Sequence, residues 1–585
     1  MRHLPGLLAG AALAVTSLLP LAPAFAAPAP AKSPEPLRAA ATPPQPTFDR
    51  VHPYEEIVSY LKGYAAAYPK WTRLESIGKS GEGRDLWMIT ITNPDTGPEM
   101  GKPAMYIDGN THANEVQGTE TALYTVDFLL KNYGKLPRVT ELLDRAVFYV
   151  LPVVNADGRA AWFGKPSNAS YPRTVMVPVD DDRDGRVDED GPDDLDGDGV
   201  LTEMRKKVPL GQGTHRLDPK DPRILVPVGP EELGDYLSLG DEGSDEDGDG
   251  RVNEDSVGYV DPNRTYGYLW EPEYVESGAG PYPLSIPESR AIALWGIAHP
   301  NVAALQSYHN SGGMILRGPG AKSDPPYPPQ DIKVYDLIGK EGEKTLPDYK
   351  YLISWKDLYT VHGATTDHFY GLHGVIAFTN ELYAGALEDI NHDGTTTDEE
   401  RIRFNDVIAL GRQFADWKPF KHPQYGDVEI GGYRQDVGRV PEGWFLQQEA
   451  HRNNAFVLFH AYHLPRLSIG EVTVKKMGDR LWRLEVPVLN DRGIPSMTVQ
   501  ARTNKLHRPD IATVAGGRVV ASGLIDDPFL NKITMQDHRP ERLMVPGVNG
   551  LSTRTLLFLV EGDGEVTVQY DSLKGGKLAK KVALR

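Results

Sequence analysis

The stretch AMYIDGNTHANEVQG, residues 104–118, joins an apolar run to a polar loop and sets the fold that the sequence predicts. The apolar run is typical of a buried strand, and the residues that follow have a helical pattern. Three further strand-like runs occur at 146–155, 302–309 and 375–382, with helical patterns between them. Strands that alternate with helices predict an α/β fold.

Polar residues follow each of these four runs where the apolar pattern stops. Open α/β sheets bind their ligands at the carboxyl ends of the strands. We therefore expect candidate site residues from different strands to lie along one edge of the sheet.

The sequence pattern changes near Leu467. Gly, Asn and Asp turns separate segments in which apolar and polar residues alternate: EVTVKKM, LWRLEVPVL, MTVQART (497–503), RTLLFLVEG and EVTVQYD. This pattern predicts a small all-β sandwich domain over 466–585, with a boundary near 465.

The N-terminal residues have the features of a targeting segment. A basic start, an apolar run and an Ala-Phe-Ala end predict a signal peptide over 1–26, and 27–48 form a Pro/Ala-rich linker that we expect to be disordered. The apolar run is interrupted by proline and is too short for a membrane span. A secreted, periplasmic or extracellular protein without cysteine has no disulfides, so cores and metals must stabilise it.

The formal charge of −19 is concentrated in two short segments. Residues 180–203 contain twelve acidic side chains and two arginines, and residues 241–255 contain eight and one. Acidic charge this local favours cation binding and argues against nucleic acid as a partner.

Three D-x-D-x-D-G segments and one D-x-N-x-D-G segment match the ligand spacing of a calcium loop, which needs oxygen ligands at alternate positions and a glycine at the sixth. We expect structural Ca²⁺ sites on insertions at about 180–256 and 389–400, although metal-free acidic turns are the alternative for any single loop. A calcium sensor is disfavoured because the loops are not paired as helix–loop–helix units. The candidate ligands are Asp180, Asp182, Asp184 and Asp188; Asp194, Asp196 and Asp198; Asp245, Asp247, Asp249 and Asn253; and Asp389, Asn391, Asp393, Thr395, Thr397 and Glu400.

A second candidate metal site follows the first strand. His112 and Glu115 are three residues apart, a spacing at which both side chains can reach one cation, and His309 ends the third strand. Two histidines and a carboxylate with an open fourth position are typical of catalytic zinc, although other divalent metals can occupy such ligands.

At these residues the chain resembles the zinc carboxypeptidases of the carboxypeptidase A/B superfamily, over roughly residues 50–420. The family's H-x-x-E pair matches His112 and Glu115, and its S-x-H element matches Ser307 and His309. The resemblance, to a bacterial secreted type with calcium-loop insertions, implies a catalytic domain over 49–465 whose mixed central sheet is flanked by helices.

Further motifs extend the resemblance to the rest of a site. VDPNR matches the family's D-x-N-R element, which implies Asp261 as the partner of a zinc-bound histidine and Asn263 and Arg264 as the groups that hold the substrate's terminal carboxylate. FTNEL matches the strand of the catalytic glutamate, which implies Glu381 as general base. MRKK resembles the family's W-R-K element, which implies that Arg205 polarises the scissile carbonyl.

The resemblance also implies a substrate pocket. Tyr359 precedes Glu381 by 22 residues, the interval at which the family places a mobile tyrosine over the substrate. Thr366 stands where family members carry Asp for basic ends or an aliphatic residue for apolar ends, and Asp367 follows, so the pocket is expected to accept both classes or small polar side chains. Asn114 departs from the family, which commonly has Arg there.

Together these features predict a secreted, monomeric zinc carboxypeptidase that acts on peptide or protein C-termini. One alternative is a cell-wall peptidase of the same superfamily that cleaves D-glutamyl–diamino acid bonds. Another is a calcium-stabilised binding protein with a vestigial site, which the presence of Glu381 and all three zinc ligands argues against.

Overall fold

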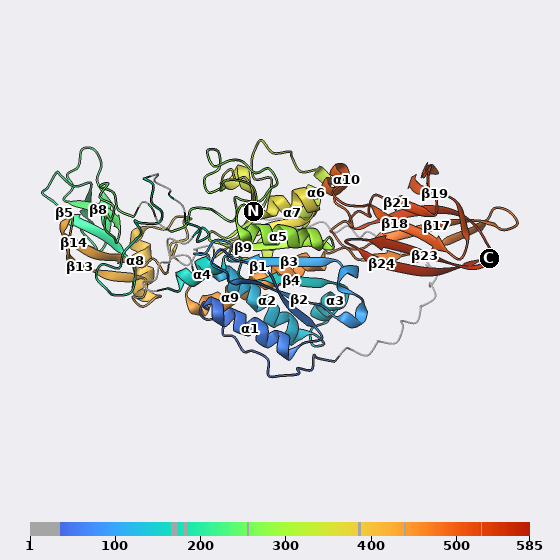
Figure 1. Ribbon diagram of the computed structural model, residues 1–585, viewed down its shortest axis with the longest axis horizontal. Coiled ribbons are helices and arrows are strands. Elements are labelled where there is room, and N and C mark those ends of the chain that lie inside the picture. Colours follow the sequence, from blue (N-terminus) through green and yellow to red (C-terminus); the bar gives the residue numbers. More distant parts are fainter. Residues whose placement is uncertain are drawn as a thin grey trace, which may run out of the picture.

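The computed structural model describes residues 35–164, 173–178, 180, 184–253, 255, 257–383, 388–437, 440–527 and 529–585. Figure 1 shows three parts in a row: a central α/β domain, a β-rich lobe on one side and a β-sandwich on the other.

The central domain is built on an eight-stranded sheet in the order β1-β2-β4-β3-β9-β12-β10-β11. Its pairs are parallel at β4-β3-β9-β12 and β10-β11 and antiparallel elsewhere, so the prediction of a mixed central sheet is confirmed. The strands are β1 (Thr72–Lys79), β2 (Asp85–Ile91), β3 (Ala104–Gly109), β4 (Val147–Leu151), β9 (Val302–Asn310), β10 (Met314–Arg317), β11 (Lys350–Ile353) and β12 (Ile376–Leu382).

Helices cover both faces of this sheet. In Figure 1, α5 and α7 lie on one face, and α1, α2 and α9 lie on the other. The helices of the domain are α1 (Tyr54–Ala67), α2 (Gln117–Asn132), α3 (Pro137–Arg145), α4 (Ala156–Trp162), α5 (Pro287–Ala298), α6 (Pro329–Thr345), α7 (Thr365–His373) and α9 (Gly443–Tyr462), with short turns η1 (Pro94–Thr96), η2 (Glu99–Gly101) and η3 (Ser354–Leu358). The four predicted strands are β3, β4, β9 and β12; all are parallel and buried, so their carboxyl ends share one edge.

The predicted insertion at 180–256 forms one lobe together with residues that follow the predicted insertion at 389–400. Its six-stranded sheet has the order β13-β14-β5-β8-β6-β7, so strands after residue 400 pair with strands of the first insertion. The elements are β5 (Glu203–Lys207), β6 (His215–Leu217), β7 (Leu225–Pro227), β8 (Tyr236–Asp241), α8 (Asp398–Val407), β13 (Phe414–His422) and β14 (Gly426–Tyr433).

The C-terminal part forms the expected sandwich. One sheet has the order β15-β17-β22-β19-β20, with β16 on β17, and the other has the order β21-β18-β23-β24. The strands are β15 (Leu467–Ile469), β16 (Thr473–Lys476), β17 (Leu481–Asn490), β18 (Asp510–Ala515), β19 (Arg518–Asp527), β20 (Lys532–Met535), β21 (Arg542–Val545), β22 (Ser552–Glu561), β23 (Gly564–Ser572) and β24 (Gly576–Leu584).

One expected strand of the sandwich is wrong. MTVQART contains the helix α10 (Val499–Asn504), because the Thr498 side chain accepts a hydrogen bond from the Ala501 N–H and caps the helix. The first residues of α10 contact α6, where Asp331 accepts the N–H groups of Val499 and Gln500. A helix N-terminus docked on a carboxylate thus joins the two domains.

The linker is also more ordered than expected. Residues 35–48 have no helix or strand, but Ala40 N–H donates to the Ala67 carbonyl, and the Phe48 ring, 6% exposed, lies 4.9 Å from that of Tyr124. The expectation of disorder is therefore wrong for 35–48. The signal-peptide prediction falls outside the described residues. In the described part of the chain, every helix is too short or too polar to cross a membrane.

Candidate metal centre

The loop after β3 brings His112 and Glu115 together. Asn110, in the left-handed region at φ 56°, turns the chain, and its side-chain amide donates to the carbonyls of His112 (2.8 Å) and Ala113 (3.0 Å). Glu115 N–H donates to the His112 carbonyl at 3.1 Å, which closes the turn. The fully buried Arg159 donates to Asn110 Oδ1 at 2.9 Å, so this loop is held rigidly.

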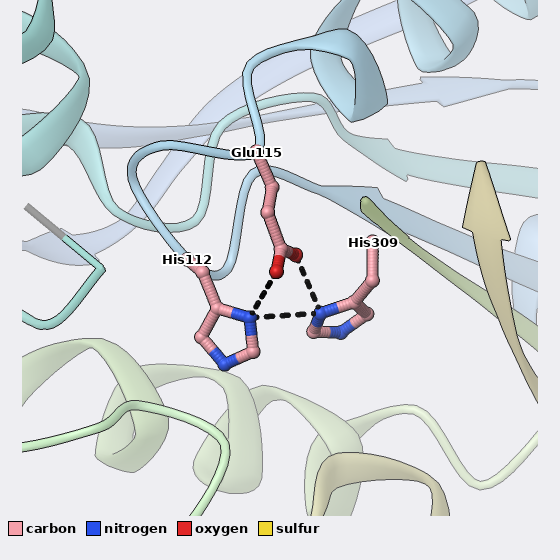
Figure 2. Close-up of side chains that lie close together, drawn as sticks. All are labelled: His112, Glu115 and His309. Atoms are coloured by element: carbon pink, nitrogen blue, oxygen red, sulfur yellow. Dashed lines mark hydrogen bonds and ion pairs between the residues drawn. The ribbon is translucent and has the colours of Figure 1, made fainter. Parts of the chain in front are cut away.

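His309, at the carboxyl end of β9, completes the site (Figure 2). Its Nδ1 lies 3.2 Å from His112 Nδ1 and 2.9 Å from Glu115 Oε2, and His112 Nδ1 lies 2.9 Å from Glu115 Oε1. Tetrahedral zinc with nitrogen ligands at 2.0–2.1 Å would separate them by about 3.3 Å. The three side chains are buried and converge on one point, so this donor set fits a zinc ion.

Neighbouring groups orient both imidazoles. Asp261 Oδ1 lies 3.0 Å from His112 Nε2, and Ser307 Oγ lies 3.2 Å from His309 Nε2, so in both rings Nδ1 is left to face the metal. Burial alone would raise the pKa of Asp261, but the charges of His112, Arg264 and Arg173 hold it well below its usual range. The expected place of Asp261 beside a zinc ligand is thus the observed one.

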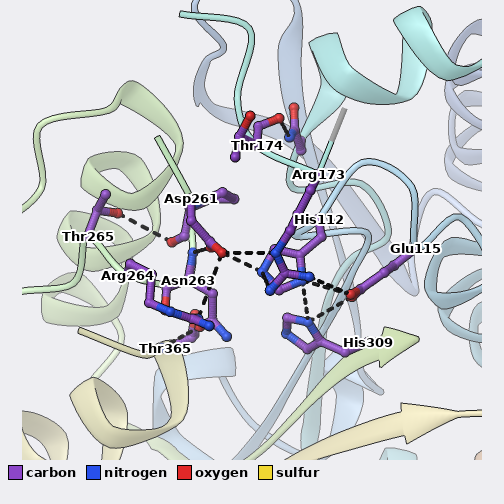
Figure 3. A network of polar contacts seen from close by, with 12 residues as sticks. His112, Glu115, Arg173, Thr174, Asp261, Asn263, Arg264, Thr265, His309 and Thr365 are labelled. Carbon is purple, nitrogen blue, oxygen red and sulfur yellow. Dashed lines mark hydrogen bonds and ion pairs between the residues drawn. The ribbon is translucent and has the colours of Figure 1, made fainter. Parts of the chain in front are cut away.

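Arg173 is a functional candidate that the sequence reading missed. Figure 3 shows its guanidinium beside His112: Nε lies 3.2 Å from Asp261 Oδ2, Nη1 lies 3.3 Å from Glu115 Oε1, and Nη2 lies 3.2 Å from His112 Nε2. A signal was available, because Arg173 lies just before the acidic insertion, between the H-x-x-E and D-x-N-R elements.

The expectation that Arg205 polarises the scissile carbonyl is wrong. Arg205 is on β5 of the insertion lobe, well away from β3 and β9 in Figure 1. Its Nε donates to Glu429 at 2.7 Å, its Nη1 donates to the Pro222 carbonyl at 3.0 Å, and the guanidinium lies 4.1 Å from the Trp417 ring. These contacts hold the guanidinium within the lobe.

Glu381 lies beside the metal ligand His309 in the strand register. On the parallel strands β9 and β12, Glu381 pairs with His309, and residues side by side in a sheet project to the same face. The general-base candidate and a metal ligand therefore leave the same edge of the sheet.

The residues expected to hold a carboxylate also gather here (Figure 3). Arg264 is 7% exposed; its Nε bonds Glu276 at 2.7 Å, its Nη1 lies 3.9 Å from Asp261 Oδ2, and the Tyr359 ring lies 5.9 Å away. Asn263 Oδ1 accepts the N–H and hydroxyl of Thr365 at the start of α7, next to the buried Thr366.

The described residues of the four acidic loops share one hydrogen bond. In each, the glycine at the sixth position donates its N–H to the first aspartate, at 2.8–3.1 Å. Asp190, from the first loop, groups with Asp245 and Asp247 of the third, and Asp194, Asp196 and Asp198 form another acidic group. In the fourth loop Thr397 caps α8 by accepting the Glu400 N–H, and the Glu400 carboxylate accepts the Thr397 N–H in return. Asp182 lies outside the described residues.

A mixed α/β sheet with a His-Glu-His centre at the carboxyl ends of its parallel strands defines a metal-dependent enzyme. A family model described as zinc carboxypeptidase matches residues 57–183 and 240–394. The central domain belongs to this family. The matched residues include Arg173 and exclude Arg205, in agreement with the contacts of the two arginines. A model described as a domain of unknown function (DUF8731) matches residues 466–583.

Individual relatives agree with the family match over short segments. Carboxypeptidase D of Anas platyrhynchos is 39% identical over 114 residues, which are 20% of this chain and 8% of that protein. Carboxypeptidase M of Mus musculus is 35% identical over 109 residues, 19% of this chain and 25% of that protein. The chain thus spans at most a quarter of these relatives. The structure of carboxypeptidase A from Helicoverpa armigera is 18% identical, covers 72% of this chain and 76% of its own, and has a TM-score of 0.43.

Proposed function

We propose that the protein is a zinc carboxypeptidase that removes residues from peptide C-termini. The observation that carries this proposal is the link from the metal centre to a buried cation: Asp261 contacts His112 with one oxygen and faces Arg264 with the other. A guanidinium that is linked to the metal centre through one carboxylate suits a substrate whose own terminal carboxylate lies one residue from the bond to be cleaved.

Zinc, when bound by His112, Glu115 and His309, supplies a Lewis acid that lowers the pKa of water and polarises a carbonyl. Glu381 takes the proton from the attacking water and later donates it to the leaving amine. Arg173 donates to the oxygen on which negative charge develops. Arg264 and Asn263 hold the terminal carboxylate, Tyr359 closes over it, and Thr366 and Asp367 line the side-chain pocket.

The test is a mixed peptide library incubated with the mature protein and its Glu381→Gln variant, with products read by mass spectrometry. A zinc-selective chelator is added in one arm, with calcium in excess so that loss of zinc is separated from any loss of calcium. Stepwise C-terminal trimming that requires both zinc and Glu381 is expected. Cleavage of muropeptides with free C-termini left intact would replace this proposal by the cell-wall reading, and zinc binding without any cleavage would replace it by a binding role.

We also propose that the acidic loops hold structural Ca²⁺. Support comes from the shared turn in all four loops and from the convergence of Asp190, Asp245 and Asp247, which would join two loops through one cation. Export of the protein is likewise a proposal, supported by the signal-peptide pattern of residues 1–26. The N-terminal sequence of the secreted product would test it.

A further inference from the structure

The outer face of one sandwich sheet carries a groove of about 500 Å³. In the order β21-β18-β23-β24, alternate residues are buried against the other sheet, and the intervening ones face outward. The outward residues align across the strands in two rows, which are Met544, Ile511, Asp571 and Lys577, and Arg542, Thr513, Gln569 and Ala579.

The charges in this groove are unbalanced toward the positive. Asp571 is paired with Arg508 at 2.9 Å, and on the same face Glu565 is paired with Lys581 at 3.0 Å. Within the described part of the chain, Arg542 and Lys577 have no ion-pair partner. Residues 466–585 as a whole contain 19 Lys and Arg against 13 Asp and Glu, whereas the full chain has a net charge of −19.

Beside the paired Asp571, the middle of the groove carries the neutral hydrogen-bonding side chains of Thr513 and Gln569. Thr513 donates its hydroxyl to Gln569 Oε1 at 3.2 Å, so the amide N–H groups of the exposed Gln569 can donate to a ligand. Ile511 and Met544 add apolar surface beside them, and Met544 is 57% exposed. Arg542 and Lys577 lie at opposite edge strands, about 15 Å apart by strand spacing and register.

We propose that this groove binds a linear acidic polysaccharide. Two cations without ion-pair partners, separated by uncharged donors and acceptors and by Asp571, whose charge is offset by Arg508, match a polymer with sparse carboxylates and many hydroxyls between them. Nucleic acid fits poorly, because duplex DNA carries about one charge per 1.7 Å. A partner peptide strand would pair with a sheet edge, whereas this groove crosses the strands on the face. The sandwich would then hold the central domain on a carbohydrate matrix.

The experiment measures binding of the full mature protein to oligogalacturonate, hyaluronate, neutral dextran and single-stranded DNA by calorimetry at physiological salt. The wild type is expected to bind at least one acidic glycan and to show no binding to dextran. Arg542→Glu with Lys577→Glu should weaken binding by about tenfold or more. Thr513→Val with Gln569→Leu should also weaken binding, although the charge is unchanged.

The matched control is Lys475→Glu with Lys532→Glu, which makes the same charge change on the other sheet. Unchanged binding by this control supports the groove. Equal loss in the control would overturn the proposal, because attraction would then follow net charge alone. Binding to neither glycan, or tighter binding to single-stranded DNA, would overturn it as well. Peptidase activity of all variants is read in parallel and should stay constant, so this test is separate from that of the proposed function.

Discussion

Arg205 resembles a catalytic arginine in its local sequence, whereas Arg173 lies beside the metal ligands in the structure. The contacts place Arg173 beside the metal ligands His112 and Glu115 and place Arg205 inside the insertion lobe, and the proposed mechanism therefore gives carbonyl polarisation to Arg173. We therefore compare Arg173→Met with Arg205→Met, since methionine keeps most of the side-chain length and removes the charge.

Arg173→Met removes one preorganised charged donor, and loss of such a donor typically lowers kcat by about 10²–10³. The Arg173 side chain is 34% exposed, so solvent weakens its field and we expect about 10². Arg205→Met should leave kcat/KM unchanged. It breaks the contact with Glu429 and leaves the Pro222 carbonyl without its donor, so the lobe should lose about 1–3 kcal/mol of stability.

The assay is steady-state kinetics on N-acylated dipeptides, with zinc content and calorimetric unfolding measured on the same samples. Full zinc occupancy in Arg173→Met is needed to assign its loss to the reaction, because Arg173 also contacts Asp261 and Glu115. If Arg205→Met lost activity with its zinc and lobe intact while Arg173→Met kept it, the reasoning from contacts would be refuted.

Three further predictions concern stability. Burial raises the pKa of Asp367 to about 7, so the folded protein keeps a proton that the unfolded chain releases near pH 4. The free energy of unfolding should therefore fall as pH rises from about 4 to 7, by at most about 4 kcal/mol. In urea unfolding, Asp367→Asn should show a weaker dependence of this free energy on pH, and an unchanged dependence contradicts the assignment. Lys574 of the sandwich donates to the carbonyls of Val302 (2.7 Å) and His373 (2.6 Å) in the central domain. Lys574→Met should therefore lower the free energy of unfolding by roughly 3 kcal/mol and let the sandwich melt separately in calorimetry. A single unchanged transition would argue against this interdomain role. Calcium chelation in a zinc-buffered solution, or Asp245→Asn in excess calcium, should lower the melting temperature of the insertion lobe while zinc stays bound; an unaltered melt in both would count against calcium.

The central sheet and the metal ligands could be predicted because their signals are local. Each of the four strands is a short apolar run, and His112, Glu115 and His309 lie within a few residues of the strand ends. Once the runs are recognised as strands of one parallel set, their polar ends must meet at one edge. The register of Glu381 with His309 follows from the same geometry, although the sequence alone does not contain it.

The errors arose where local similarity competed with distant packing. MRKK resembles a family element, but Arg205 belongs to an insertion whose sheet is completed by β14, more than 200 residues later. MTVQART alternates like a strand over too few residues to exclude a helix, and Thr498 with the acceptor Asp331 from another domain decides it. Short periodic segments are therefore assigned reliably only when the partner that buries them is known.

The distribution of charge gives the three parts of the molecule different roles. Residues 180–256 contain 25 acidic and 9 basic side chains, whereas the sandwich carries a net positive charge, and Figure 1 shows the two at opposite ends of the central domain. A polyanion held by the sandwich would be repelled by the acidic lobe if the two were close, but exposed charges interact weakly beyond about 8 Å at physiological salt. The central domain separates the two fields, so the lobe can concentrate cations while the sandwich attracts an anionic matrix. Reversing the charge of the groove should therefore change where the enzyme binds and leave its reaction unaltered.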